Sequence, residues 1–164
     1  MKYRQKYKKV LKSTFSSLIV VAAIAVLIAT LMLPVLQIQG SSMEPTLNDE
    51  EIVVLLKTST MKKGELCCFS YQNKLLIKRV IGLPGDTVEI KNGEDGVFLV
   101  YVNGELIEEK YAYHGIRYSK PETGVWTIGE GELFVLGDNR YNSTDSRDDR
   151  VGPINIDSLL GKVV

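Results

Sequence analysis

The sequence predicts a mainly β protein in which one apolar helix precedes a compact β domain. The first observation is an uncharged apolar stretch at residues 18–36. The second is the pattern from Glu51 onward, where short apolar runs alternate with turn signals, as is typical of strands. The chain has 164 residues, 45% of them hydrophobic, which is enough to bury one core beyond the helix. We therefore expect the strands to form a closed or nearly closed β-barrel or sandwich.

The apolar stretch is long enough to cross a membrane. As a helix, residues 18–36 would extend about 28 Å, close to the thickness of the hydrocarbon core. A buried helix of a globular domain would show a polar stripe, which this stretch lacks. A secretion signal would end at small residues, whereas residues 32–38 are bulky. The stretch therefore predicts a single retained span in the lipid bilayer.

Basic residues flank this stretch on its N-terminal side. The first 13 residues contain six basic and no acidic side chains. The positive-inside rule then places the N-terminus in the cytoplasm. We expect a single-pass protein of the cell membrane with a basic cytoplasmic tip at 1–13, a transmembrane anchor at 14–37 and an extracytoplasmic β domain at 38–164.

Charge and composition exclude several kinds of function. Of the 20 basic residues, six lie in the first segment, which leaves 14 basic against 20 acidic residues in the rest, a net charge of −6. An acidic domain is a poor partner for nucleic acid. The two cysteines, Cys67 and Cys68, are adjacent, and His114 is the single histidine. They cannot build a disulfide framework and provide too few ligands for a structural zinc site, so we expect no metal or cofactor.

Strands are predicted along most of the β domain. The dipeptide Asn103-Gly104 favours a tight hairpin turn. We expect a surface loop at 111–124, and a short helix near 156–160 with Asp157 as its cap. The expected strands are 52–57, 66–71, 74–82, 87–91, 97–102, 106–108, 125–128 and 133–137.

Ser42 is a candidate nucleophile. It lies shortly after the apolar stretch, between Gly40, which permits an unusual backbone conformation, and Pro45, which restricts the residue before it. A serine between two such constraints is held on a rigid turn, as a nucleophile requires. An ordinary turn next to the membrane has the same composition, so this segment alone leaves both interpretations open.

Lys78 is a candidate base for that serine. A serine hydroxyl needs an adjacent base, and a lysine can serve only if burial lowers its pKa from about 10.4. In the strand 74–82, alternation places Lys78 on one face with the apolar side chains Leu76 and Val80. A solvated lysine on an edge strand is the alternative. This strand alone does not decide between them.

Two further polar segments follow. Residues 82–86 are rich in glycine but lack the Lys-Ser/Thr end of a phosphate loop, and we interpret them as a turn. Residues 137–150 interleave charges of both signs, which is typical of a solvated loop. This segment follows the apolar run 133–136 directly, however, so its first residues are expected near the core.

Three of these segments together resemble the type I signal peptidases, membrane-bound Ser/Lys proteases that remove signal peptides from exported proteins. Behind a membrane span, the three in this order are highly specific, and the resemblance covers the anchor and nearly all of the outer domain. The segments are Gly-x-Ser-Met-x-Pro-Thr-Leu at 40–47, Lys-Arg-Val-Ile-Gly-Leu-Pro-Gly-Asp at 78–86, and Gly-Asp-Asn-Arg-x-x-Ser-x-Asp-Ser-Arg at 137–147.

The resemblance implies a role for each matching residue. Ser42 would be the nucleophile, Lys78 the general base, and Ser143 the group that orients the lysine amine. The Ser42 backbone N–H would form the oxyanion hole, whereas Gly40 stands where some members have a second, hydroxyl donor. Because eukaryotic relatives have histidine in place of the lysine, Lys78 indicates a bacterial-type enzyme.

The resemblance also implies structural ion pairs and a substrate. The pairs would be Asp145 with Arg147 and Arg79 with Asp138. The substrates would be the signal peptides of secreted preproteins, cleaved through an acyl-enzyme after small-x-small motifs. Two alternatives stay open: a Ser/Lys protease that cleaves itself or one dedicated partner, and a non-catalytic, membrane-tethered β domain that binds peptides. The sequence does not indicate an oligomeric state.

Overall fold

The computed structural model describes residues 2–94, 97–114 and 123–164. The chain forms two compact units, Met1–Pro34 and Val35–Val164. Of the loop expected at 111–124, residues 115–122 lie outside the described part of the chain.

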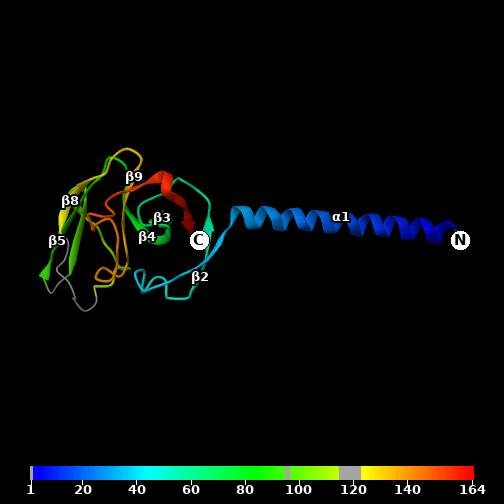
Figure 1. The fold of residues 1–164 in the computed structure, drawn as a ribbon, viewed down its shortest axis with the longest axis horizontal. Helices are drawn as coiled ribbons and strands as arrows, with labels where there is room; N and C mark the ends of the chain where they lie inside the picture. The colour runs from blue at the N-terminus through cyan, green and yellow to red at the C-terminus, as the bar shows by residue number, and fades with distance from the viewer. Residues whose placement is uncertain (1, 95–96, 115–122) are drawn as a thin grey trace. The chain divides into compact units, whose positions relative to one another are not determined.

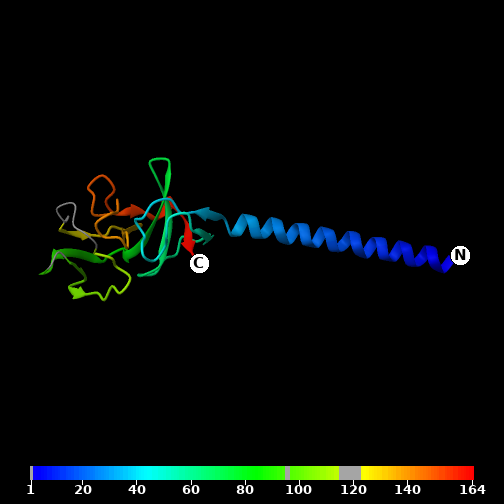
Figure 2. The same cartoon turned by 90° about the horizontal axis from the view of Figure 1, so that it is seen from below.

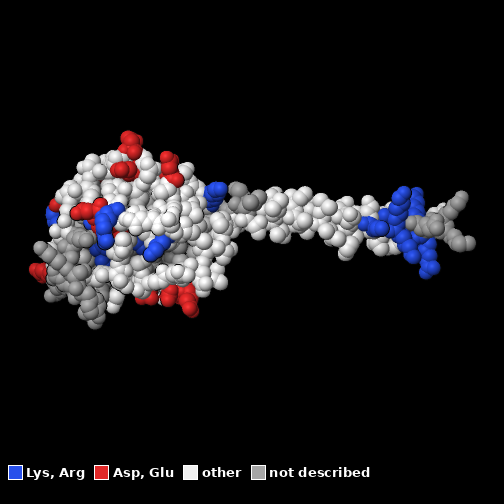
Figure 3. All heavy atoms as spheres, in the orientation of Figure 1, with Lys and Arg blue, Asp and Glu red and all other residues white. Residues whose placement is uncertain are grey.

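The first unit is the helix α1, Lys2–Met32. Its segment Lys6–Thr30 is long and apolar enough to cross a membrane. Figure 3 shows basic side chains gathered near its N-terminal end, followed by a long stretch without charged side chains. The expectation that helix continues through residue 36 is wrong, because α1 ends at Met32 and Val35–Gln37 form the strand β1. Pro34 explains the end, since proline has no N–H to donate and disfavours helix in the residue before it.

The second unit contains two antiparallel sheets, which confirms the mainly β class (Figure 1). The larger sheet has seven strands in the order β1-β2-β11-β3-β4-β9-β10. Besides β1, its strands are β2 (Ile52–Leu56), β3 (Leu66–Tyr71), β4 (Lys74–Gly82), β9 (Glu132–Leu136), β10 (Ile154–Asn155) and β11 (Leu159–Val163).

The smaller sheet has four strands in the order β7-β6-β5-β8. They are β5 (Thr87–Asn92), β6 (Phe98–Val102), β7 (Glu105–Leu106) and β8 (Gly124–Thr127). The predicted hairpin is confirmed: β6 pairs with β7 across Asn103 and Gly104, both at positive φ, as a tight hairpin turn requires. Residues 82–86 form the expected turn, in which the Asp86 carboxylate accepts a hydrogen bond from the Leu83 N–H.

The C-terminal segment corrects one prediction. The helix expected near 156–160 is a single 3-10 turn, Ile156–Ser158, capped by Asn155 and not by Asp157. Leu159 already begins β11, which pairs with β2 on one side and β3 on the other. Pairing with strands far away in the sequence overrides the local preference of this segment.

Three apolar clusters hold the second unit together. One lies between the sheets and is centred on β5, β6 and β9, and Figure 2 shows the two sheets side by side from a second direction. Another packs β3, β4 and β9 against the C-terminal segment. The third joins the segment after β1 to β2 and consists of Ile38, Met43, Leu47 and Val53. This third cluster fixes the segment that carries Ser42.

Candidate active site

Ser42 lies on a turn that packs against the third apolar cluster. Met43 and Leu47 are buried in the third cluster on the C-terminal side of Ser42. On its N-terminal side, Gly40 has φ +88°, a conformation that favours glycine, and its N–H donates to the Asp49 carboxylate at 2.8 Å. Gly40 therefore provides the unusual conformation that the sequence suggested, and Ser42 is held at the edge of the core.

Lys78 meets Ser42 from β4. Its Nζ lies 2.7 Å from Ser42 Oγ and donates to the Ile77 carbonyl at 2.9 Å. The residue is only 2% exposed, which rejects the alternative of a solvated lysine on an edge strand. Burial lowers the pKa of Lys78 below its ordinary value of 10.5, against the opposing fields of Asp145 and Asp138. A neutral amine can take a proton from a hydroxyl at this distance.

A cleft leads to this pair. It has a volume of about 530 Å³ and is lined by residues 36–39 on one side and residues 74–78 on the other, with Ser42 and Lys78 among its walls. A second hollow of about 480 Å³ adjoins Ser42 and Lys78 and is lined by residues 141–144. A chain bound in the first cleft would therefore contact Ser42 and Lys78.

Ser143 does not make the contact that the resemblance implies. It lines the second hollow together with Lys78, but the Lys78 amine is bonded to Ser42 and Ile77. Among the described residues the buried Ser143 Oγ has no partner within hydrogen-bond geometry, although its hydroxyl lies near enough to Asp145 to help lower the pKa of that carboxyl.

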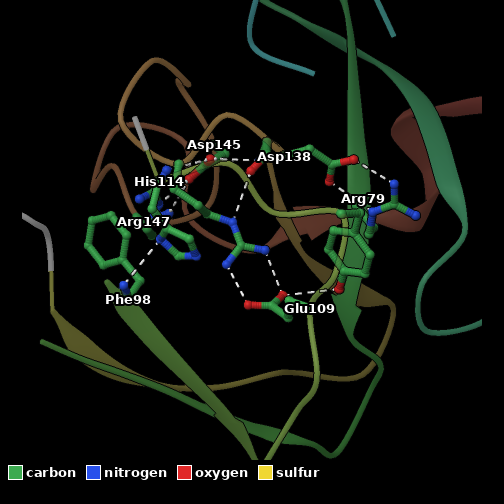
Figure 4. Close-up of polar contacts among 10 residues, drawn as sticks. Arg79, Phe98, Glu109, His114, Asp138, Asp145 and Arg147 are labelled. Carbon is green, nitrogen blue, oxygen red and sulfur yellow. Dashed lines mark hydrogen bonds and ion pairs between the residues drawn. The ribbon is translucent and has the colours of Figure 1, made fainter. Parts of the chain in front are cut away.

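Both expected ion pairs are present, and Figure 4 shows the four side chains together. Arg147 donates from Nε and Nη2 to the two oxygens of Asp145 at 2.8 and 2.9 Å. Arg79 donates from Nε to Asp138 at 2.8 Å and from Nη2 at 2.5 Å. The pKa of Asp145 is low although burial alone would raise it, because the Arg147 charge and hydrogen bonds outweigh the burial.

A third buried pair was missed by sequence reasoning. Arg140 donates from both terminal nitrogens to Glu109 at 2.6 Å, and both side chains are almost fully buried. Glu109 also accepts a hydrogen bond from the Tyr111 hydroxyl, and the Tyr111 ring lies 3.9 Å from the guanidinium of Arg79. Glu109 and Tyr111 therefore connect two of the arginines. No motif signals Glu109, because its partner lies 31 residues away in the sequence.

Asn139 and Asn142 are also part of the site. They lie within the third motif, where sequence reasoning gave them no role. Asn139 contacts the backbone of Ser41 and Ser42, and Asn142 donates to Ser41 Oγ at 2.7 Å. Asn139 is a specified position of the motif, which is the signal that could have found it, whereas Asn142 stands at an unspecified position.

The single histidine takes no part in these contacts. His114 Nδ1 accepts a hydrogen bond from the Phe98 N–H at 3.3 Å, on the smaller sheet (Figure 4). Cys67 and Cys68 are free and buried in β3, and burial raises the pKa of Cys67 to about 12. Within residues 2–94, 97–114 and 123–164, no group of three His, Cys, Asp or Glu side chains is placed to hold a metal ion.

Comparisons with known proteins agree on one family. The family model described as signal peptidase, peptidase S26 matches residues 11–164. The chain is 34% identical to signal peptidase I of Bacillus amyloliquefaciens, over 80% of this chain and 74% of that protein, and 32% identical to signal peptidase I U of Bacillus subtilis, over 96% and 87%. A solved signal peptidase I from Enterococcus faecalis is similar with a TM-score of 0.52 at 28% identity, covering 64% of this chain and 97% of that one. This chain therefore belongs to the signal peptidase family, peptidase S26.

Proposed function

We propose that this chain is a membrane-anchored serine endopeptidase that removes signal peptides from exported preproteins, with Ser42 as nucleophile and Lys78 as general base. The observation that carries the proposal is the position of the Lys78 amine, which is buried and 2.7 Å from Ser42 Oγ. Family membership supports the substrate class, since the relatives are named signal peptidases.

The reaction is an acyl transfer in two halves. Neutral Lys78 takes the Ser42 proton as Oγ attacks the scissile carbonyl carbon, and the carbonyl electron pair moves to oxygen. The Ser42 N–H stabilises that oxyanion. The carbon–nitrogen bond then breaks, the leaving amine takes the proton from Lys78, and an acyl-enzyme on Ser42 remains. In the second half Lys78 takes a proton from water, the hydroxide displaces Ser42, and the proton returns to Oγ.

Two carboxylates act on the Lys78 amine, but neither bonds to it. Asp145 and Asp138 would by themselves stabilise the protonated lysine. Each is already bonded to an arginine, Arg147 and Arg79, so neither is free to form an ion pair with the amine. We assign these two pairs a structural role. We assign Ser143, whose buried hydroxyl lines the hollow next to Lys78, the role of orienting the amine during turnover.

The cleft fits an extended peptide. β9 pairs with β4 only from Arg79 onward, so residues 74–78 offer a free strand edge to the cleft. A substrate that adds a strand there would direct alternate side chains, at positions −1 and −3 before the cut, toward the enzyme. Shallow pockets would accept only small residues at those positions, in agreement with the small-x-small rule of signal peptides.

We also propose that α1 is the membrane anchor. Its segment Lys6–Thr30 has the required length and composition. The six basic residues before residue 14 favour a cytoplasmic N-terminus and an extracytoplasmic catalytic domain. Since Val35–Gln37 belong to a sheet, we place the end of the anchor before them and not at residue 37.

The proposal is tested by cleavage of a model preprotein by the full chain in detergent. The preprotein has small residues at −1 and −3, and an otherwise identical one has bulky residues there. Ser42→Ala and Lys78→Ala should each lower kcat/KM by about 1,000-fold or more, because the nucleophile and its base act as a unit. Lys91→Ala, at an exposed lysine on β5, is the matched control and should be fully active. Near-normal cleavage by Ser42→Ala or Lys78→Ala would refute the dyad, and equal cleavage of both preproteins would refute the substrate assignment.

A further inference from the structure

The turn at residues 138–142 holds the backbone of the nucleophile from one side. The Asn139 N–H donates to the Ser42 carbonyl at 3.1 Å. The Asn139 side-chain Nδ2 donates to the Ser41 carbonyl at 3.2 Å. That Ser41 carbonyl also accepts the Glu44 N–H at 3.2 Å, so it is held by two donors.

The second of these contacts determines where the Ser42 N–H points. The Ser41 carbonyl and the Ser42 N–H belong to one planar peptide unit. In a trans peptide such as this one, the C=O and N–H point in opposite directions. Holding the Ser41 carbonyl toward Asn139 therefore turns the Ser42 N–H away from Asn139. Among the hydrogen bonds of the described residues, that N–H donates to none, so it is available to a ligand.

The backbone around Asn139 is fixed by further hydrogen bonds. The backbone on either side of it is paired with Tyr113, whose N–H donates to the Asp138 carbonyl and whose carbonyl accepts the Arg140 N–H. The Arg140 side chain is locked by Glu109 and also donates to the Gly137 carbonyl at 3.1 Å. Asn139 is 8% exposed. Because its backbone is fixed, the Asn139 side chain can hold the Ser41–Ser42 peptide in one orientation.

We propose that Asn139 is a positioning residue that orients the Ser42 backbone N–H toward the developing oxyanion. The inference rests on the proposed function of Ser42. Asn139 acts through the Ser41–Ser42 peptide and does not touch the substrate. Because Gly40 supplies no side-chain donor nearby, the orientation of this one N–H carries more of the stabilisation.

The consequence appears in the transition state. The oxyanion exists only after Oγ has attacked, so a misdirected N–H lowers kcat and leaves KM nearly unchanged. Removal of an oxyanion donor costs about 100- to 1,000-fold in kcat. Loss of its orientation alone should cost less, about 10- to 100-fold.

The test compares Asn139→Ala and Asn139→Asp with Asn48→Ala in the full chain in detergent. Asn48 is the matched control, an exposed asparagine whose amide reaches the Glu51 carboxylate. Two inhibitors are used: a peptide aldehyde, in which Ser42 Oγ bonds to the aldehyde carbon and the carbonyl pair moves to oxygen as an oxyanion, and the matching product peptide, which forms no bond.

We expect Asn139→Ala to lower kcat about 10- to 100-fold and to raise the Ki of the aldehyde by the same factor. KM and the Ki of the product peptide should stay within about twofold, and the apparent pKa of the pH profile should not move. Asn139→Asp should be impaired at least as much, because its carboxylate has no N–H to donate at neutral pH. Asn48→Ala should behave as the unsubstituted chain.

Two results separate the failure of this inference from that of the proposed function. An unchanged aldehyde Ki in Asn139→Ala, or a loss seen entirely in KM, would overturn the positioning role alone if Ser42→Ala is inactive. Irreversibly inactive enzyme would lower kcat without changing either Ki, and reversible unfolding would raise the Ki of the aldehyde and of the product peptide alike, so a merely structural defect would not raise the aldehyde Ki alone. Cleavage by Ser42→Ala would overturn both proposals.

Discussion

Two regions of the molecule bury basic side chains with different hydrogen-bond partners: the surroundings of Lys78, and the group of ion pairs near it. We use ion-pair layer for Arg79–Asp138, Arg140–Glu109 and Arg147–Asp145. Lys78 and Arg140 are equally inaccessible, at 2% exposure each. Each arginine bonds directly to a carboxylate, whereas the hydrogen-bond partners of the Lys78 amine are a hydroxyl and a carbonyl, which are neutral.

This difference shifts the pKa values of Lys78 and Arg140 in opposite directions. Burial opposes the charged form in both places. For Lys78 burial dominates and lowers the pKa, while for Arg140 the hydrogen bonds and charge of Glu109 outweigh burial and raise the pKa further. A carboxylate in direct contact therefore offsets the effect of burial on the pKa of a cation, and without one burial dominates. The two carboxylates that act on the Lys78 amine, Asp145 and Asp138, are bonded to arginines instead.

The largest expected effect comes from removing a carboxylate in the ion-pair layer. Glu109→Gln keeps the shape of the side chain but leaves the Arg140 charge buried and unpaired, which should lower the free energy of unfolding by about 3–5 kcal/mol. Urea unfolding followed by the fluorescence of Trp126, the single tryptophan, measures it. Glu108→Gln is the matched control: Glu108 is exposed and pairs with the exposed Lys110, and its substitution should cost less than about 0.5 kcal/mol. Equal changes in the free energy of unfolding for the two substitutions would show that the buried pair stabilises the fold no more than an exposed one.

A smaller effect is expected where the two regions meet. A Cβ added at Gly137 would overlap Ser143 Oγ and lie 2.6 Å from the Ser42 carbonyl oxygen. Gly137→Ala should displace Ser42 and lower kcat/KM by about 100-fold, equivalent to about 2.7 kcal/mol, because catalysis depends on reacting atoms held at short range. Gly131→Ala, where φ is +75° and the new Cβ meets open space, controls for the loss of a glycine and for backbone strain without overlap with a neighbour, and should keep its activity. Full activity of Gly137→Ala would mean that this backbone does not fix the nucleophile.

The smallest effect concerns the cost of burying Lys78. Lys78→Met should be inactive yet more stable at neutral pH, by about 1–3 kcal/mol, because it removes a buried amine that has no carboxylate partner. Below the folded-state pKa, both the folded and the unfolded chain hold the proton, and the full cost of burial is present. Between that pKa and 10.5 the unfolded state binds more protons than the folded state, so the stability of the unsubstituted chain rises with pH. The advantage of Lys78→Met should therefore shrink as the pH approaches 10.5. A constant advantage at every pH would contradict this.

Local sequence patterns predicted the strands that carry their own signal. The long strand β4 was predicted with its observed bounds. The Asn103-Gly104 dipeptide correctly predicted the hairpin between β6 and β7. Three strands were missed: β1, β10 and β11. Two of these have only two or three residues, and β11 exists because β2 and β3 pair with it on both sides. Such strands form because neighbouring strands pair with them, so their own residues give little local signal.

The residues of the site also differ in how far local sequence could predict them. Ser42 and Lys78 were open candidates in their own segments until the family resemblance singled them out, and the structure brings their side chains together from positions 36 residues apart. Glu109 could not be found, because its contact with Arg140 depends on how the chain after β7 returns to lie beside residues 138–140. Asn139 was visible in its motif, but its role depends on the direction of one peptide plane, which no residue pattern encodes.

The central claim is that the Lys78 amine is neutral at the pH where the enzyme works. It is tested most directly by titrating the ε-carbon signal of Lys78 in the full chain with 13C-labelled lysine, assigned by its absence in Lys78→Met. The account predicts a midpoint well below 10.5, at the same pH at which kcat/KM rises. A midpoint at or above 10.5, as a lysine bonded to a carboxylate would show, would contradict it.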